Sequence, residues 1–500
     1  MSEKKEPLSL INLGIDTNQE YVVFLRRDSP VCKSEGFIAL NRIEVDVRNK
    51  KIIASLNIVE TEILQIGQVG LSESAWKAVN AKEGDPVILS HLQPVLSMHD
   101  VRSKIYENRL NEESFRRIIQ DIKDEKYSNI EIASFITACS GDHLNLDEIK
   151  SLTKAMIKAG SVLKWDKHPI VDKHCIGGLP GNRTTPIVVS IVAAAGLTVP
   201  KTSSRAITSP AGTADVMESI TDVNLKLSEM KSVVEKEGGC IVWGGSIGLS
   251  PVDDILIRVE RALEVDSTGQ MIASVLSKKA AAGSTHVVID IPIGKTAKVR
   301  TEEDAEKLKY YFTVVGKSVD LKVKVLISDG SQPVGRGIGP SLEIKDCIEV
   351  LKNDRNAPQD LKQRALTIAG EMLEFAAPHQ FKNGIQTASE ILESGKAWKK
   401  FENICKAQGG WKEPSLSKFH QNVISKSSGM ISEIDNRKIA KVARLAGAPN
   451  SSSAGVYFLS PIGKKIEKGD VLYTIHSDSE GELEYAFEYL NSQNGIITIL

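Results

Sequence analysis

The stretch that most constrains the fold runs from Pro169 to Glu218, where strand, loop and helix patterns alternate twice. An extended segment, Ile170–Asp172, leads into a glycine-rich loop over residues 173–185 and then an apolar helix pattern over Pro186–Ala195. A short strand and a second loop rich in hydroxyl side chains, residues 203–213, follow. Strand-to-helix turns of this kind are common in parallel α/β folds, so the stretch predicts one.

The glycine-rich loop contains the parts of an oxyanion site. A loop that leads into a helix can direct several backbone N–H groups to one point, where the helix dipole also favours negative charge. Lys173 adds a positive charge, and Thr184 and Thr185 add hydroxyl donors. The spacing matches neither the Walker A motif nor the dinucleotide motif Gly-x-Gly-x-x-Gly. An ordinary strand-to-helix turn is the alternative interpretation.

Length and composition describe an ordinary globular protein. The chain has 500 residues, which predicts two to four domains. Its net charge of -1 gives no field that favours nucleic acid or an acidic membrane. Its six cysteines show no zinc-binding spacing, so we expect no metal site and a reducing, cytoplasmic setting. The start has no signal-peptide pattern, and no apolar run is long enough to cross a bilayer.

The hydrophobic period changes along the chain and predicts a multidomain α/β protein. Residues 1–94 alternate as in a small β-rich domain, and residues 95–165 have the helical period of a domain completed by about 250–283. Residues 166–249 and 284–415 predict a mostly parallel α/β domain that faces the helical one and binds phosphate. Residues 416–500 predict a C-terminal α+β module that resembles a barrel-sandwich.

Several local patterns carry further expectations. Ser128 and Glu131 have the spacing of a capping box, and Phe115, Ile118, Ile119 and Ile122 mark one apolar helix face. Ser274 and Lys278 are four residues apart in a helix pattern, which fits either a ligand contact or a solvated helix face. The glycine-rich loop at 328–340 is either a surface connection or a ligand lid.

Several separated motifs follow one another along the chain: Val171–His174 with Gly177 and Gly178, Ser203–Arg205, Ala211–Asp215 with Glu218, Val265–Ser267, Ser274, Lys278–Lys279 and the Asp329–Gly330 loop. Over about Val101 to Ile475 they resemble the thymidine and pyrimidine-nucleoside phosphorylase family. The N-terminal domain is extra, and the sequence of Ser204–Ser209 with Pro180 resembles the AMP phosphorylase branch, whose members carry such a domain.

The resemblance implies that phosphate attacks the anomeric carbon of a nucleoside or nucleotide, which releases the base and a sugar 1-phosphate. It implies phosphate contacts from Lys173, Thr185, Ser203 and Thr213. Cys175 stands where the family usually has Ser. His174 would lie beside the base or sugar, and Asp266 would donate a proton to the departing base. The substrate contacts implied are Gly178, Ser204, Arg205, Ala206, Ile207, Thr208, Ser209, Ser274, Lys278, Lys298 and Arg258. Arg261 is the alternative to Arg258 for the same role.

The Asp266 assignment has a physical condition and an alternative. A carboxyl donates a proton at neutral pH only if its pKa is raised well above its ordinary value of about 3.9. Because Asp is favoured at helix starts, Asp266 could instead be a helix N-cap. The resemblance implies no cofactor, with inorganic phosphate as co-substrate, and a homodimer or larger homo-oligomer.

Three function classes follow. The first is a phosphorylase acting on thymidine, uridine or AMP. The second is a catalytically silent nucleotide-binding sensor. The third is a phosphoribosyltransferase, which would need Mg²⁺ and an acidic pair in a glycine loop; Asp253 and Asp254 lie in a helix pattern instead.

Overall fold

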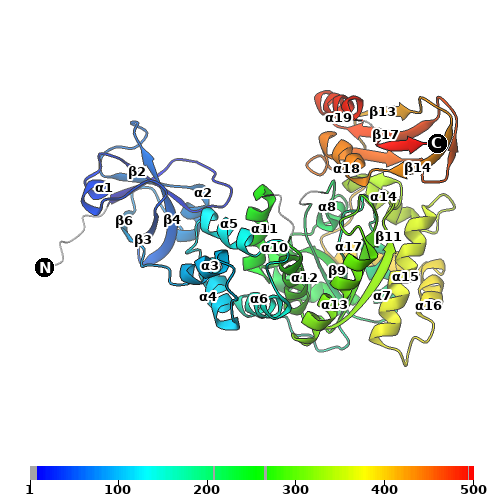
Figure 1. Cartoon of the computed structure of the whole chain (residues 1–500), viewed down its shortest axis with the longest axis horizontal. Helices are drawn as coiled ribbons and strands as arrows, with labels where there is room; N and C mark the ends of the chain where they lie inside the picture. Colours follow the sequence, from blue (N-terminus) through cyan, green and yellow to red (C-terminus); the bar gives the residue numbers. More distant parts are fainter. Residues whose placement is uncertain (1–7, 207–208, 264–266, 494) are drawn as a thin grey trace. The chain divides into compact units, whose positions relative to one another are not determined.

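A computed structural model describes residues 8–206, 209–263, 267–493 and 495–500 (Figure 1). The chain divides into two compact units. The first unit comprises Met1–His143 with Ile255–Val265, and the second comprises Leu144–Asp254 with Asp266–Leu500. Each unit has its own hydrophobic core, and each is described separately below.

The first unit begins with a closed β-barrel. The alternating sequence of β3 explains how it forms, because Ile43, Val45 and Val47 are fully buried while the residues between them are partly exposed. Successive side chains of a strand point to opposite faces, so this alternation fills the barrel interior. The strands are β1 (Leu8–Asn12), β2 (Val22–Arg26), β3 (Arg42–Val47), β4 (Lys50–Val59), β5 (Gln68–Leu71) and β6 (Pro86–His91), paired in the order β1-β5-β2-β4-β3-β6. Short helices α1 (Pro30–Glu35) and α2 (Glu73–Val79) accompany them.

Helices complete the first unit: α3 (Met98–Ile105), α4 (Glu112–Lys123), α5 (Asn129–Ala138) and most of α11 (Pro251–Leu263). The predicted apolar face of α4 is confirmed, since its four marked residues are all buried. The capping box is also present. The Ser128 hydroxyl accepts from the Glu131 N–H, and the Glu131 carboxylate accepts from the Ser128 N–H. The pair satisfies N–H groups that a helix start leaves without partners.

The second unit is built on parallel strands: β7 (Val171–Cys175), β8 (Val199–Ser203), β9 (Gly239–Trp243), β10 (His286–Ile293) and β11 (Lys322–Asp329). One sheet has the order β11-β10-β7 and another pairs β8 with β9. A parallel bridge from Ile170 to Thr198 joins them. β10 lies between β7 and β11 and is buried along most of its length, which explains its nearly continuous apolar sequence.

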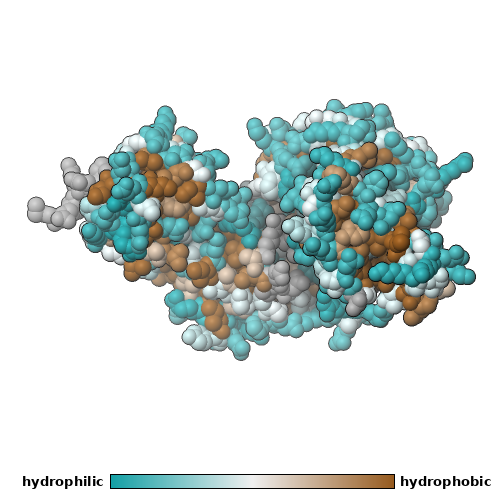
Figure 2. Space-filling model, turned by 90° about the horizontal axis from the view of Figure 1, so that it is seen from above, coloured by the Kyte–Doolittle hydropathy of each residue, from teal (hydrophilic) through white to brown (hydrophobic). Residues whose placement is uncertain are grey.

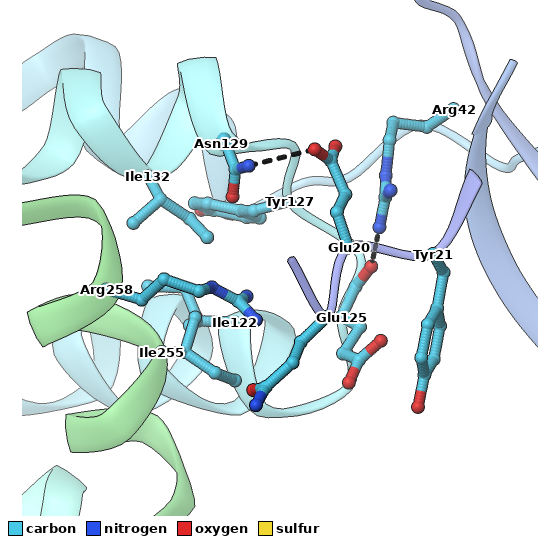
Figure 3. Close-up of a pocket in the computed structure, with 11 residues that line it drawn as sticks. Glu20, Tyr21, Arg42, Ile122, Glu125, Tyr127, Asn129, Ile132, Ile255 and Arg258 are labelled. Carbon is cyan, nitrogen blue, oxygen red and sulfur yellow. Dashed lines mark hydrogen bonds between the residues drawn. The ribbon is translucent and has the colours of Figure 1, made fainter. Parts of the chain in front are cut away.

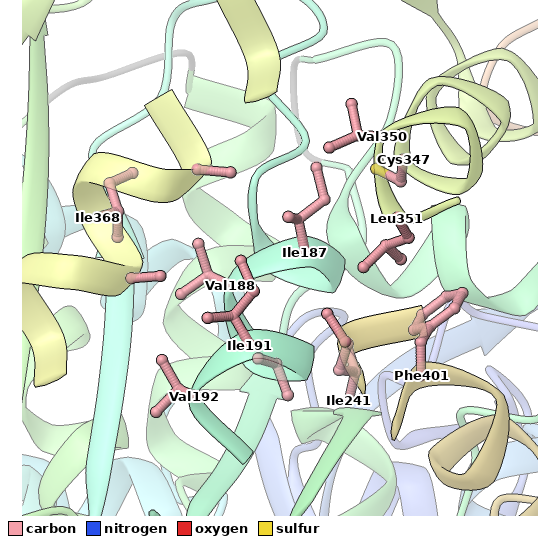
Figure 4. Close-up of a cluster of buried hydrophobic side chains, with 14 of the residues drawn as sticks. Ile187, Val188, Ile191, Val192, Ile241, Cys347, Val350, Leu351, Ile368 and Phe401 are labelled. Atoms are coloured by element: carbon pink, nitrogen blue, oxygen red, sulfur yellow. The ribbon is translucent and has the colours of Figure 1, made fainter. Parts of the chain in front are cut away.

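Helix α7 (Thr185–Ala194) is the centre of the main hydrophobic core. Ile187, Val188, Ile191 and Val192 are fully buried among residues from surrounding helices (Figure 4). A helix that is apolar on every side must be covered on every side. The other helices of this unit are α6 (Leu146–Ala159), α8 (Thr213–Glu218), α9 (Leu227–Glu237), α10 (Gly244–Ile247), α12 (Thr268–Ala281), α13 (Glu302–Lys317), α14 (Pro340–Leu351), α15 (Gln359–Ala376), α16 (Gly384–Glu393) and α17 (Lys396–Ala407).

The C-terminal residues add two small antiparallel sheets. Their orders are β12-β15-β17-β13 and β16-β14-β18. The strands are β12 (Gly337–Ile338), β13 (Phe419–Ile424), β14 (Gly429–Ile434), β15 (Gly455–Phe458), β16 (Lys465–Ile466), β17 (Val471–Ser477) and β18 (Ile497–Ile499), with helices α18 (Asn436–Leu445) and α19 (Glu480–Ser492).

The glycine-rich loop at 328–340 is a packed connector. It supplies β12, which pairs with β15 of the C-terminal sheet. Val334 of the same loop is buried, and its carbonyl accepts a hydrogen bond from the Asn182 N–H. The loop is therefore a connection anchored at both places, and a role as a ligand lid stays a prediction.

The surface and the helices agree with a globular multidomain α/β protein. Figure 2 shows hydrophobic residues in separate patches among hydrophilic ones, as is normal for protein surfaces. Within the described residues, every helix is too short or too polar to span a lipid bilayer. All six cysteines carry free thiols. The domain boundaries expected from the sequence remain predictions.

Truncating Ile191 to Ala tests whether α7 is the centre of this core. We expect the free energy of unfolding to fall by about 2–5 kcal/mol, because the side chain is fully buried. Tryptophan fluorescence in a urea titration reports the change, since Trp243, Trp398 and Trp411 pack against the same cluster. The matched control is Ile424→Ala at a position that is 56% exposed, which should cost less than about 0.5 kcal/mol. Equal losses in the two variants would contradict the assignment.

Candidate active site

The candidate site lies where β7 ends and α7 begins. Lys173 is 2% exposed, and its Nζ donates a hydrogen bond to the Thr184 hydroxyl at 2.6 Å. Thr184 is the N-cap of α7, and in the described part of the chain its side chain caps no helix N–H group. Thr185, the first residue of α7, is also buried. A cation and an uncapped helix start therefore lie together, which suits an oxyanion.

Charge and burial act against each other at Lys173. Burial lowers the pKa of its ammonium group, while Cys175, Asp290 and Asp172 oppose that shift. Asp290 lies on β10 directly opposite Cys175 and is 1% exposed. An anion bound beside Lys173 would favour its charged form in the same way.

Asp172 connects three elements of the site. It is fully buried, and its Oδ2 accepts a hydrogen bond from Lys279 Nζ of α12 at 2.7 Å. Lys201 Nζ of β8 lies 3.4 Å from Asp172 Oδ1. Lys201 and Lys279 are themselves 5% and 3% exposed. Asp172 thus pairs with two buried lysines, and Asp290 is the buried carboxylate that acts most strongly on Lys173.

Arg183 holds the glycine-rich loop against α8 and α14. Its guanidinium donates to the Thr213 hydroxyl at 2.6 Å, to the Ala211 carbonyl at 2.9 Å and to the Glu343 carboxylate at 2.7 Å. Glu343 is 2% exposed, so this is a buried ion pair. Because Thr213 accepts from Arg183, its own hydroxyl proton can be donated to another acceptor.

Gly178 and Lys298, both implied as substrate contacts, lie against each other. Gly178 has a φ of +79°, and a Cβ there would lie 2.4 Å from the Lys298 backbone nitrogen. At Gly181, with a φ of +67°, a Cβ would lie 2.2 Å from the Val334 carbonyl oxygen. The loop therefore needs glycine at both positions, for its left-handed backbone and for close packing.

Side chains of the second loop mostly bond within the loop and its neighbours. The Ser203 hydroxyl donates to the Val242 carbonyl at 3.0 Å, so it must rotate before it can donate to an anion. The Ser209 hydroxyl donates to the Ala211 carbonyl at 3.1 Å. The Ser204 carbonyl accepts from the Ala214 N–H. Ile207 and Thr208 lie outside the described residues.

Arg205 is held by two acids and an aromatic ring. Its guanidinium donates to Glu218 at 2.7 Å and to Asp215 at 3.2 Å, and it lies 4.9 Å from the centre of the Trp243 ring. Asp215 also accepts from the N–H groups of Ala206 and Gly212. The loop conformation therefore depends on Asp215, and the charge of Arg205 is already compensated.

Helix α12 presents two of the implied substrate contacts. Lys278 is 28% exposed at its side chain and pairs with the buried Asp253 at 2.7 Å, and Ser274 is half-buried. Both positions are thus partly exposed, and the Lys278 ammonium is engaged by Asp253. The N-cap of α12 is Ser267, whose hydroxyl accepts from the Gln270 N–H. Asp266 itself lies outside the described residues.

His174 and Cys175 are both neutral groups. Burial lowers the pKa of His174 well below its ordinary value, and Lys279, Lys201, Lys278 and Lys173 lower it further. Its imidazole is uncharged at neutral pH and can accept or donate one hydrogen bond. Burial raises the pKa of the Cys175 thiol to about 12, and Asn182 donates to its sulfur at 3.3 Å.

The remaining implied contact, Arg258, belongs to the first unit. It lines a small pocket there with Tyr21 and Glu125 (Figure 3).

Sequence reasoning missed the roles of Arg183, Lys201 and Asp215. A signal was available for Lys201, a lysine that directly follows the apolar Val199 and Pro200 in a predicted strand. In the described parts of the chain, no three His, Cys, Asp or Glu side chains are placed to bind a metal ion.

Comparison with known proteins agrees with this arrangement. Residues 101–160 match the model "Glycosyl transferase family, helical bundle domain" and residues 167–398 match "Glycosyl transferase family, a/b domain". Residues 430–496 match "Pyrimidine nucleoside phosphorylase C-terminal domain".

Relatives match over nearly the whole chain. Proteins named "Putative thymidine phosphorylase" from Maricaulis maris and Hahella chejuensis are each 51% identical, over 99% and 98% of this chain and 96% and 97% of their own. The solved structure of anthranilate phosphoribosyltransferase from Thermus thermophilus aligns with a TM-score of 0.51 at 20% identity. It covers 62% of this chain and 98% of its own, and shows a shared fold.

Replacing Lys173 by Met tests the anion site without any turnover. We expect the affinity for inorganic phosphate to fall about 10- to 100-fold, because a hydrogen bond to a charged group contributes about 1.5–3 kcal/mol. Isothermal titration calorimetry measures the change. Lys309→Met, at an exposed position of α13 paired with Glu306, is the control and should bind as the natural protein does. Unchanged phosphate affinity in Lys173→Met would place the anion elsewhere.

Replacing Asp172 by Asn tests the buried lysine cluster. We expect the free energy of unfolding to fall by about 3–5 kcal/mol, because two buried lysines lose their carboxylate partner. Urea denaturation measures the loss. The double variant Asp172→Asn/Lys279→Met should recover part of it, since one unpaired charge is then removed. A loss no larger than that of an exposed ion pair, below about 1 kcal/mol, would show that the cluster is not charged as described.

Proposed function

Because the chain belongs to the thymidine and pyrimidine-nucleoside phosphorylase family, we propose that thymidine and inorganic phosphate are its substrates. The enzyme is a pentosyltransferase that cleaves an N-glycosidic bond with phosphate. On thymidine the products are thymine and 2-deoxyribose 1-phosphate. The observation that carries the proposal is the buried Lys173 beside the uncapped N-terminus of α7.

The attacking phosphate is held at the end of β7. Lys173 supplies the charge, and the start of α7 with Thr185 supplies further donors. Thr213 is oriented by Arg183 with its proton available to the anion. The Ser203 hydroxyl donates to the phosphate after it rotates away from the Val242 carbonyl. Preorganised donors of this kind need little rearrangement when phosphate binds, which favours the reaction.

The departing base needs a proton or a hydrogen bond, because negative charge develops on it as the glycosidic bond breaks. We assign this role to Asp266. Ser274 and Lys278 of α12 are the base contacts, and the Asp253 carboxylate orients the Lys278 ammonium. His174, held neutral, serves as a hydrogen-bonding group beside the sugar rather than as a cation. Lys298, against Gly178, completes the substrate contacts.

AMP is the second candidate substrate. The hydroxyl-rich segment Ser204–Ser209 resembles that of the AMP phosphorylase branch and could contact a 5′-phosphate. Cleavage of AMP would give adenine and ribose 1,5-bisphosphate. The surroundings of Arg205 disfavour AMP as the substrate, because Glu218 and Asp215 already compensate the charge of this arginine. A nucleoside has no 5′-phosphate, so its binding needs no further cation in that loop.

We also propose that the reaction needs no cofactor, and that the enzyme is a cytoplasmic homodimer or larger homo-oligomer. Activity that survives EDTA would support the first point.

A substrate panel tests the function directly. We expect phosphate-dependent release of thymine from thymidine, less from uridine and little adenine from AMP, measured by liquid chromatography. Asp266→Asn should lower kcat about 100- to 10,000-fold, because general acid catalysis contributes about that factor. Exclusive cleavage of AMP would establish the second candidate. Release of no base from any substrate, with phosphate binding intact, would identify a silent sensor.

A further inference from the structure

The turn that follows β10, residues 294–298, carries Lys298 and is closed by its own hydrogen bonds. The Ala297 N–H donates to the Gly294 carbonyl at 3.0 Å, and the Gly294 N–H donates to the Val299 carbonyl at 3.1 Å. Because these bonds make the turn compact, a shift of any part of it moves Lys298 as well. The contacts that hold the turn from outside therefore decide where Lys298 lies.

Asn436, the first residue of α18, is fully buried and bonds to this turn. Its backbone N–H donates to the Thr296 hydroxyl at 3.1 Å. An N–H group at a helix start has no partner within its own helix, so the turn supplies one. The Asn436 side-chain amide donates to the Gly330 carbonyl at 3.0 Å. That carbonyl packs on the start of the turn, since a Cβ on Gly294 would lie 2.2 Å from it.

Two weaker contacts join the same segments. Arg437 of α18 donates to the Ala297 carbonyl at 3.4 Å. Lys295 pairs with Glu433 of β14, but their side chains are 84% and 58% exposed. An exposed ion pair contributes little, whereas the loss of a buried hydrogen bond leaves a polar group without a partner. Asn436 is therefore the contact that holds the turn most firmly.

We propose that Asn436 is a positioning residue of the reaction, which holds Lys298 against Gly178 of the glycine-rich loop at 173–185. The inference rests on the proposed function, because that function makes Lys298 a substrate contact. A Cβ on Gly178 would lie 2.4 Å from the Lys298 backbone nitrogen, so the turn and the loop are in close contact. Asn436 is buried behind the turn and acts through Lys298.

A double-mutant cycle in the full chain tests this role, with the variants Asn436→Ala, Lys298→Met and the two together. We expect Asn436→Ala to lower kcat/KM for thymidine about tenfold, because a small misplacement of a substrate contact disturbs the reacting geometry. Phosphate affinity, measured by calorimetry, should stay within about twofold, since Lys173 and the start of α7 keep their contacts. In the Lys298→Met background, Asn436→Ala should lower kcat/KM less than about twofold further.

Two controls separate this role from a general loss of stability. Asn422→Ala removes an exposed asparagine of β13 that accepts from the Thr474 hydroxyl at 2.9 Å. Lys295→Met removes the exposed ion pair to Glu433. Each should leave kcat/KM within about twofold.

A second pair of variants breaks the same contact from the side of the turn, and it decides the matter if Asn436→Ala does not fold. Thr296→Val removes the hydroxyl that accepts from Asn436 and should lower kcat/KM for thymidine about fivefold or more. Thr296→Ser keeps a hydroxyl and should recover most of that loss. Equal losses in the two variants would contradict the proposal.

Hydrogen exchange of residues 293–300, followed by mass spectrometry, reports on the turn without any turnover. We expect exchange about tenfold faster in Asn436→Ala and unchanged exchange in Asn422→Ala. Unchanged exchange in Asn436→Ala, or an equal loss of kcat/KM in both backgrounds of the cycle, would overturn the proposal. If the natural protein cleaves no substrate, the proposed function fails by itself, and the exchange rates then decide whether Asn436 holds the turn.

Discussion

Buried lysines need a negative partner, and in the second unit Asp172 supplies it to Lys201 and Lys279. The carboxylate sits on β7, one residue before Lys173, and its two partners come from β8 and α12. Strand β8 and helix α12 are thereby fixed to β7. The proposed preference of the loop before α7 for an oxyanion rests on the buried Lys173 and the uncapped start of α7.

Regular structure was predictable because it depends on local pattern. The apolar face of α4, the capping box at Ser128 and the apolar strand β10 all follow from residues close together in the sequence. The turn from β7 into α7 was also predictable, since glycines, a lysine and a helix start adjoin each other there, while its binding of phosphate stays a prediction.

The partners of the site could not be predicted in the same way. Lys279 reaches Asp172 across 107 positions of sequence, and Arg183 reaches Glu343 across 160. Only the folded chain shows that Arg205, which resembles a substrate contact, is engaged by Glu218 and Asp215. Ion pairs between residues so far apart in the sequence leave no periodic pattern in it. Asp266, Ile207 and Thr208 keep the roles that the resemblance implies, as predictions.

The connector at 328–340 changes how the C-terminal sheets should be regarded. Val334 lies against Gly181 of the phosphate loop, and Gly337–Ile338 forms a strand with β15. Removing the chain beyond residue 415 would leave that strand with an unpaired edge and free the connector from one of its two anchors. The C-terminal module therefore supports the glycine-rich loop at 173–185, and a shortened enzyme would be expected to lose the arrangement of that loop before it loses its α/β core.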